Sequence, residues 1–307
     1  MTKVVFMGSP DFAVPGLRAI AGLYTVVGVV AQPDKPAGRG QRLTPCPVKA
    51  AALELGLPVL TPDKLRDALP QLQAWQPDLI LVAAYGKILR PSVLNLPPLG
   101  CVNVHASLLP RHRGAAPIAA ALLAGDAETG VTLMKMDEGL DTGPILASRS
   151  LAIEPGNTAS SLTTRLAALG AELVRDRLPD YIAGRLTPVP QDDSLATYAP
   201  MLKKEDGRLR FTETAASLER RVRAMYEWPG AYFVHAGSPI KVLRAHLRPD
   251  RVAAPGRAIK IDGLPAIGTA EGALVLDEIQ PAGKRPMPGA SYLNGNPNFV
   301  GTNLTLL

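Results

Sequence analysis

The sequence predicts an α/β protein with a doubly wound, mostly parallel sheet, followed by a smaller domain of short strands. Two observations carry this prediction. The chain opens with a short apolar run, a helical stretch and a continuous β-branched run, at residues 3–7, 11–22 and 24–31. Strand, helix and strand in that order are typical of a parallel sheet with crossover helices. Beyond residue 230, short β-like runs separated by Gly and Pro indicate a small antiparallel barrel.

The remaining elements of the first part follow from periodicity and from start and stop signals. Asp11 lies near the start of the first helix, Pro117 opens a later helix that Gly125 follows, and Asn157 with Thr158 caps a long helix. Further helices are expected at residues 48–55, 63–75, 117–123 and 157–178. Further strands are expected at residues 59–61, 78–85, 100–105, 131–136 and 145–153, the last as an arm of a hairpin.

Residues 32–47 interrupt this alternation with four prolines and two glycines. A loop of this length inside a compact domain is usually functional or disordered. Its basic side chains, Lys35, Arg39 and Arg42, make it a basic flap, which we expect to be mobile.

The second part begins after a proline-rich, aperiodic stretch that we interpret as a linker at residues 190–204. We therefore predict domains at residues 1–189 and 205–307. The second domain is expected to hold a helix at residues 212–226, strands at residues 231–235, 240–246, 258–261, 265–267 and 273–279, and a polar tail at residues 294–307.

Charge separates the two parts. Of the 33 Lys and Arg and 27 Asp and Glu, residues 1–202 carry 18 and 17, a balance of +1, whereas residues 203–307 carry 15 and 10, a balance of +5. A basic second domain suggests a polyanionic partner, although a merely basic solvated surface explains the same balance.

Composition also indicates the cellular compartment in which the protein works. The chain of 307 residues is 47% hydrophobic, which suffices for a sizeable core. No apolar run approaches the roughly 18 residues of a membrane span, and the N-terminus lacks the pattern of a signal peptide. Its two cysteines, Cys46 and Cys101, fit a reducing compartment. We expect a cytoplasmic protein that binds no membrane.

Candidate catalytic residues cluster where the strand at residues 100–105 ends. Asn103 and His105 are two residues apart, so a strand places both side chains on one face. An amide donor beside an imidazole suits a reaction that passes through an oxyanion. An acidic, glycine-rich loop at residues 137–144 supplies Asp141, with Asp137 and Glu138 as alternatives that spacing does not separate.

The sequence lacks the motifs of several common classes of enzyme. It has no G-x-G-x-x-G after the first strand, no G-x-x-x-x-G-K and no G-x-S-x-G. His105 and His112 have no convincing partner for a metal. A polar constellation without a metal or a protein nucleophile indicates direct transfer between two bound substrates.

Two motifs then identify a family. V-N-V-H-A-S-L-L-P-R-H-R-G-A-A-P-I and the downstream A-G-D-A-E-T-G-V-T-L-M-K-M-D-E-G-L-D-T-G-P-I-L resemble the folate-dependent formyltransferases. The resemblance implies a Rossmann-like catalytic domain with an OB-like C-terminal barrel, and 10-formyltetrahydrofolate as formyl donor with no metal. It implies that Asn103, His105 and Asp141 are catalytic. It also implies that the folate is bound by Ser107, Leu108, Leu109, Pro110, Tyr85 and Gly86.

Within that family, the loop Q-P-D-K-P-A-G-R-G-Q-R-L-T-P and the basic C-terminal domain with W-P-G-A at 228–231 resemble the members that act on initiator methionyl-tRNA. The implied tRNA-binding residues are Lys35, Arg39, Arg42 and Lys204, with Lys203 as an ambiguous neighbour of the last. We expect a monomer. The rival interpretations are a formyltransferase for a small amine, a hydrolase that releases formate from the same folate, and a non-catalytic RNA-binding protein.

Overall fold

The computed structural model describes residues 2–37 and 42–304, and its internal contacts divide the chain into two compact units. The first unit comprises Met1–Pro117, Glu128–Ala152 and Leu162–Pro200, and the second comprises Ile118–Ala127, Ile153–Ser161 and Met201–Leu307. The last boundary, after Pro200, lies inside the stretch that the sequence suggested as a linker.

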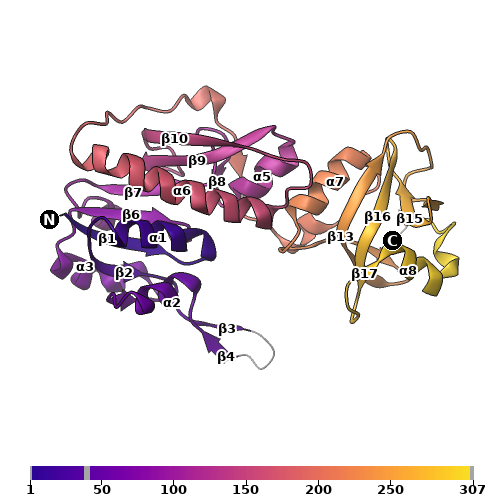
Figure 1. Cartoon of the computed structure of the whole chain (residues 1–307), viewed down its shortest axis with the longest axis horizontal. Coiled ribbons are helices and arrows are strands. Elements are labelled where there is room, and N and C mark those ends of the chain that lie inside the picture. The colour runs from indigo at the N-terminus through magenta and orange to yellow at the C-terminus, as the bar shows by residue number, and fades with distance from the viewer. Residues whose placement is uncertain (1, 38–41, 305–307) are drawn as a thin grey trace. The chain divides into compact units, whose positions relative to one another are not determined.

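A seven-stranded sheet with the order β10-β9-β7-β6-β1-β2-β5 forms the centre of the first unit (Figure 1). Its strands are β1 (Lys3–Gly8), β2 (Thr25–Val30), β5 (Val59–Leu60), β6 (Leu79–Ala83), β7 (Cys101–His105), β9 (Glu128–Lys135) and β10 (Ile145–Ala152). Five neighbouring strands pair in parallel, in the order β7, β6, β1, β2 and β5. β9 instead runs antiparallel to β7 and forms a hairpin with β10. The mostly parallel, Rossmann-like sheet predicted from the sequence is therefore confirmed.

Helices cover both faces of this sheet. Those of the first unit are α1 (Val14–Ala21), α2 (Pro47–Glu54), α3 (Leu69–Trp75), α4 (Pro91–Leu94) and most of α6 (Ala159–Ile182). On one face, Ile80 and Val82 of β6 share a buried cluster with Leu72 of α3. On the other face, α6 approaches closely, since a Cβ at Gly170 would lie 3.0 Å from Val104 Cγ1.

The stretch at residues 32–47 departs from the irregular loop that its composition predicted. β3 (Lys35–Ala37) and β4 (Arg42–Thr44) pair as an antiparallel hairpin. Prolines obscured this pairing, because proline is depleted in strands yet tolerated at sheet edges. Arg39 and the side chain of Arg42 lie outside the described residues.

The second unit holds an antiparallel sheet with the order β12-β13-β16-β15-β14, to which β17 adds on β16. Its strands are β12 (Ala231–His235), β13 (Ser238–Arg248), β14 (Ala258–Ile261), β15 (Leu264–Gly268), β16 (Ala273–Pro281) and β17 (Met287–Pro288), and its helices are α5 (Pro117–Ala124), α7 (Ala215–Ala224) and α8 (Gly289–Gly295). The five predicted strands are confirmed. Among the described pairings none joins β12 to β14, so closure into an OB-like barrel is not shown.

The prediction of a polar tail at residues 294–307 is wrong for residues 294–304, and residues 305–307 lie outside the described part of the chain. A short 3-10 turn, Pro297–Phe299, follows α8, and Phe299 is fully buried. Its ring packs edge-on against His235 and Tyr292, with ring centroids 5.1 and 5.4 Å away, and Leu304 is buried in the same cluster. One aromatic among polar neighbours gives no periodic signal, which is why the sequence concealed this part of the core.

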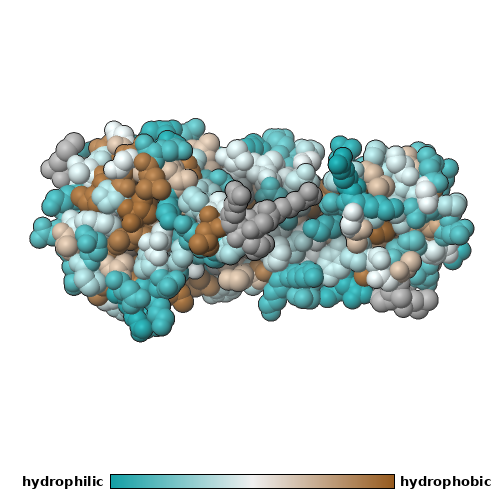
Figure 2. All heavy atoms as spheres, turned by 90° about the horizontal axis from the view of Figure 1, so that it is seen from below, coloured by the Kyte–Doolittle hydropathy of each residue, from teal (hydrophilic) through white to brown (hydrophobic). Residues whose placement is uncertain are grey.

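On the face drawn in Figure 2, hydrophilic residues cover most of the surface, and hydrophobic residues gather in a patch at the left of the view. Large exposed apolar side chains such as Ile88 and Val252 belong to separate segments. Within the described chain, no helix combines the length and the apolar character that spanning a bilayer requires.

Phe299→Ala is expected to destabilise the second unit by about 3 to 5 kcal/mol, because it empties a closed aromatic site. Val300→Ala is the matched control, since Val300 is 43% exposed and its truncation removes little buried area. Urea denaturation followed by circular dichroism measures both changes. Equal midpoints for the two variants would show that the end of the chain is not part of the core.

Candidate active site

The candidate site is built on the end of β7. Asn103 pairs with Val82 of β6 and with Met134 of β9, and His105 pairs with Thr132. Because β7 is flanked by strands on both sides, its backbone is rigidly held. Asn103 and His105 project from the face of β7 that also carries Cys101, and the side chain of His105 is buried.

Asp141 completes a group of three polar side chains. Its Oδ1 lies 3.5 Å from the Asn103 amide nitrogen, and its Oδ2 lies 3.6 Å from His105 Nδ1. Both distances are long for hydrogen bonds. The structure thus brings together the three residues predicted to be catalytic, in an arrangement with room to tighten around a bound group.

The loop geometry separates Asp141 from the acidic alternatives. Asp137 Oδ1 accepts hydrogen bonds from the Gly139 amide and the Thr142 hydroxyl, so this carboxylate braces its own turn. Glu138 is exposed. Asp141 instead accepts a hydrogen bond of 2.8 Å from the Gly114 amide. Only Asp141 of the three carboxylates therefore contacts Asn103 and His105 in the described structure.

One hydrogen bond fixes the orientation of His105. Its Nε2 lies 3.0 Å from the carbonyl oxygen of His112. A carbonyl oxygen only accepts, so Nε2 carries a proton. The nitrogen that faces Asp141 is consequently Nδ1, which is the free nitrogen of the neutral ring.

The S-L-L-P segment, residues 107–110, is held by hydrogen bonds to Thr132 of β9. The Thr132 hydroxyl donates to the Ser107 carbonyl over 2.7 Å and accepts from the Leu109 amide over 3.2 Å. The Ser107 hydroxyl donates to the Arg111 carbonyl, and the Leu109–Pro110 peptide is cis. Ser107 and Leu109 are buried, which leaves Leu108 and Pro110 as the partly exposed side chains of this segment.

Tyr85 and Gly86 follow β6, the strand next to β7. The Tyr85 ring is buried, and burial raises the pKa of its hydroxyl to about 12. The Tyr85 carbonyl accepts a hydrogen bond of 2.9 Å from Gln32 Nε2. Gly86 has a φ of 75°, and a Cβ there would meet Gln32 Nε2 at 2.7 Å, so a larger residue would displace this contact. What Tyr85 and Gly86 present to a ligand is therefore backbone.

Comparison with known proteins decides the family. Residues 3–178 match the family described as Formyl transferase, and residues 201–297 match Formyl transferase, C-terminal domain. The chain belongs to the formyl transferase family. The resemblance predicted from the sequence motifs is confirmed, and the chain is an enzyme of the transferase class.

Curated relatives match over nearly the whole chain. A protein named methionyl-tRNA formyltransferase from Myxococcus xanthus (strain DK1622) is 51% identical over 298 residues, covering 96% of this chain and 95% of the relative. A protein of the same name from Halorhodospira halophila (strain DSM 244 / SL1) is 52% identical over 299 residues, covering 95% of this chain and 96% of the relative.

Solved structures share the fold at low identity. WlaRD, described as a sugar 3N-formyl transferase in the presence of dTdp and 5-N-Formyl-THF, superposes with a TM-score of 0.69 at 18% identity, covering 93% of this chain and 99% of WlaRD. HypX from Aquifex aeolicus in complex with tetrahydrofolic acid gives a TM-score of 0.63 at 19% identity over 97% of this chain. This chain spans about half of HypX, 48% of its length.

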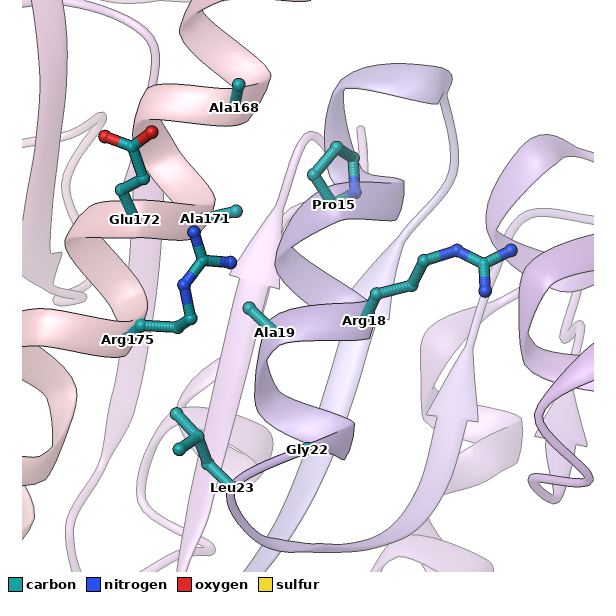
Figure 3. Close-up of a pocket in the computed structure, with 9 residues that line it drawn as sticks. All are labelled: Pro15, Arg18, Ala19, Gly22, Leu23, Ala168, Ala171, Glu172 and Arg175. Carbon is teal, nitrogen blue, oxygen red and sulfur yellow. The ribbon is translucent and has the colours of Figure 1, made fainter.

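A groove of about 500 Å³ lies elsewhere, between α1 and α6 (Figure 3). Arg18 and Arg175 line it, together with Pro15, Ala19, Gly22, Leu23, Ala168, Ala171 and Glu172. None of these residues belongs to the candidate site at the end of β7. Among the described residues, no three His, Cys, Asp or Glu side chains gather in a way that could hold a metal.

The predicted tRNA-binding residues are dispersed along the chain. Lys35 is exposed on β3, where its Nζ lies 3.2 Å from Gln32 Oε1. Lys204 is exposed in a 3-10 turn of the second unit, Lys204–Gly207, and Lys203 precedes that turn.

Sequence reasoning missed the residues that hold the site in place. The His112 carbonyl, the Gly114 amide and the Thr132 hydroxyl orient the predicted residues without resembling catalytic groups. β8 (Arg113–Gly114) pairs with β11 (Tyr198–Ala199), more than eighty residues later. No local pattern predicts such a pairing, although the R-H-R-G of the motif quoted above contains β8, one of the two paired strands.

Thr132→Val is expected to destabilise the fold by about 1 to 3 kcal/mol and to weaken folate binding, because it leaves a buried carbonyl and a buried amide unpaired. Thr129→Val is the matched control on the same strand, since the buried Thr129 hydroxyl has no hydrogen-bond partner in the described structure. Thermal unfolding and folate titration measure both variants. Equal losses in stability would contradict the role assigned to the Thr132 hydroxyl.

Proposed function

We propose that this enzyme transfers the formyl group of 10-formyltetrahydrofolate to the free amino group of initiator methionyl-tRNA, for translation initiation. The observation that carries the proposal is the convergence of Asn103, His105 and Asp141 at the end of β7. The curated relatives named methionyl-tRNA formyltransferase, about half identical over nearly the full length, support the choice of acceptor.

The chemistry begins with attack of the neutral amine on the formyl carbon. A carbon–nitrogen bond forms, the carbonyl oxygen becomes an oxyanion, and the bond to N10 of the folate then breaks. The Asn103 amide and the protonated His105 ring donate hydrogen bonds to the oxyanion. His105 donates from Nδ1, because Nε2 is engaged by the His112 carbonyl.

Asp141 accepts the proton that the attacking amine loses. Its carboxylate stabilises positive charge on the neighbouring imidazole and accepts the amine proton directly or through water. The departing N10 takes up a proton, so tetrahydrofolate leaves neutral at that nitrogen. No covalent enzyme intermediate is needed, because a deprotonated amine is already nucleophilic.

The folate is assigned to the loops that follow β6 and β7. Ser107, Leu108, Leu109 and Pro110 supply one wall, and the Tyr85-Gly86 backbone supplies another. These loops lie at the carboxyl ends of adjacent parallel strands, where open α/β sheets bind their ligands.

The acceptor tRNA is assigned to basic segments of both units. Residues 1–189 form the catalytic domain, residues 190–204 the linker and residues 205–307 an OB-like domain that binds tRNA. The last 105 residues carry a balance of +5, from 15 Lys and Arg against 10 Asp and Glu. Lys35, Arg39, Arg42 and Lys204 contact tRNA phosphates, and Arg42 also reads the acceptor stem. The enzyme works as a monomer in the cytoplasm.

A formyltransferase for a small amine is the second candidate, because WlaRD shares the fold. A small amine would not need the basic second unit or the basic hairpin of β3 and β4 for its binding. One assay separates these candidates and a formate-releasing hydrolase. Charged initiator tRNA and an amino sugar nucleotide are offered separately with 10-formyltetrahydrofolate, and transfer and formate release are measured together.

Asn103→Ala and His105→Ala are each expected to lower kcat by about 100- to 1,000-fold, because each removes one oxyanion donor. Asp141→Ala is expected to abolish most turnover. Unfolding midpoints and tRNA binding should stay close to wild type, since tRNA contacts are assigned elsewhere. Formylation at the wild-type rate by all three variants would end the assignment of this site.

Arg42→Ala is expected to reduce the preference for initiator over elongator tRNA. It should also lower the slope of log binding constant against log salt by about 0.7 to 0.9, the contribution of one phosphate contact. Arg185→Ala is the control, because it removes the same charge from a side chain that is 64% exposed and pairs with Asp180. An unchanged tRNA preference in Arg42→Ala would contradict a specificity role for Arg42.

A further inference from the structure

Gln191 bonds to the backbone of the loop that carries Asp141. Its Nε2 donates to the carbonyl oxygens of Asp141, over 2.8 Å, and Gly143, over 2.7 Å. Both amide hydrogens are therefore used, and they tie together the two ends of a three-residue turn.

This turn needs external support. Asp141 has a φ of 54°, in the left-handed region that costs a residue with a side chain roughly 1 kcal/mol or more. Gly143 approaches β9 so closely that a Cβ there would collide with the Lys135 carbonyl. A backbone in this conformation persists only where its surroundings hold it.

Gln191 is in turn held by a buried arginine. Its Oε1 accepts from Arg113 Nε over 3.0 Å and from Arg113 Nη2 over 2.8 Å. The Arg113 side chain is only 2% exposed, and its Nη2 also donates to Asp193 Oδ1 over 2.7 Å. This paired geometry fixes the amide of Gln191, so that the nitrogen and not the oxygen faces the turn.

Both parts of Asp141 are thereby anchored to one short strand. The Gly114 amide of β8 holds the carboxylate directly, and Arg113 of β8 holds the backbone through Gln191. A shift of either anchor would change the position of the carboxylate relative to His105 Nδ1.

We propose that Gln191 is a positioning residue for formyl transfer, which places the Asp141 carboxylate through the backbone of its turn. Gln191 touches no reacting group, and its effect passes entirely through Asp141. The inference rests on the proposed function, in which Asp141 accepts the amine proton.

Two substitutions test it on the full chain. Gln191→Glu keeps the oxygen that Arg113 binds but replaces the donor nitrogen with a carboxylate oxygen facing two carbonyls. Gln191→Leu removes both contacts. Gln73→Glu and Gln73→Leu repeat these changes at an exposed position of α3. Both Gln191 variants should lower kcat about 100-fold, the cost of roughly 1 Å of misplacement, with KM for folate and tRNA nearly unchanged.

A double-mutant cycle separates positioning from general stability. In the Asp141→Ala background, either Gln191 substitution should cost almost nothing further in kcat, because its effect passes through the missing carboxylate. A second readout needs no substrate. Amide hydrogen exchange at Gly114, which donates to Asp141 Oδ2, should accelerate in both Gln191 variants and in Asp141→Ala but not in the Gln73 controls.

Wild-type kcat in Gln191→Glu, losses that multiply in the Asp141→Ala background, or unchanged exchange at Gly114 would each overturn the proposal. Failure of the proposed function looks different, since wild-type enzyme would then leave charged initiator tRNA unformylated. In that case the exchange at Gly114 still decides whether Gln191 positions Asp141.

Discussion

The hydrogen bond between His105 Nε2 and the His112 carbonyl is the interaction on which the site depends. It spans 3.0 Å inside the protein, where the imidazole is buried and cannot exchange this partner for water. The bond assigns the proton to Nε2 and so turns Nδ1 toward Asp141, 3.6 Å away. If the ring were flipped by 180°, Cε1 would face the His112 carbonyl and Cδ2 would face Asp141, so both contacts of the ring nitrogens would be lost.

The segment that supplies this carbonyl also supplies the other constraints. Within three residues, His112 orients His105, Gly114 holds the Asp141 carboxylate, and Arg113 holds Gln191. The segment is itself fixed by pairing with Tyr198–Ala199. The geometry of the proposed site therefore depends on the short pairing of β8 with β11, which lies outside the main sheet.

The sequence predicted the polar residues that converge at the end of β7 better than the residues that support them. Asn103 and His105 were predictable because a strand places alternate residues on one face, and their strand is apolar and bounded by glycine. Asp141 was separable from Asp137 only through the family resemblance or through the hydrogen bonds of the folded turn. Gln191 and Phe299 were not predictable, because neither belongs to a periodic pattern. Gln191 bonds to a turn about fifty residues earlier, and Phe299 packs on distant His235 as well as on nearby Tyr292. The fold alone also does not identify the formyl acceptor, because WlaRD, described as a sugar 3N-formyl transferase, shares this fold at 18% identity.

The tautomer of His105 tests this account most directly. Long-range proton–nitrogen correlation spectra of ¹⁵N-histidine-labelled enzyme distinguish Nε2–H from Nδ1–H, and a His105→Asn variant assigns the signal among the four histidines of the chain. In the neutral form of the free enzyme, the account predicts a proton on Nε2 and an unprotonated Nδ1. A neutral His105 with its proton on Nδ1 would contradict it, because the His112 carbonyl could not then orient the ring.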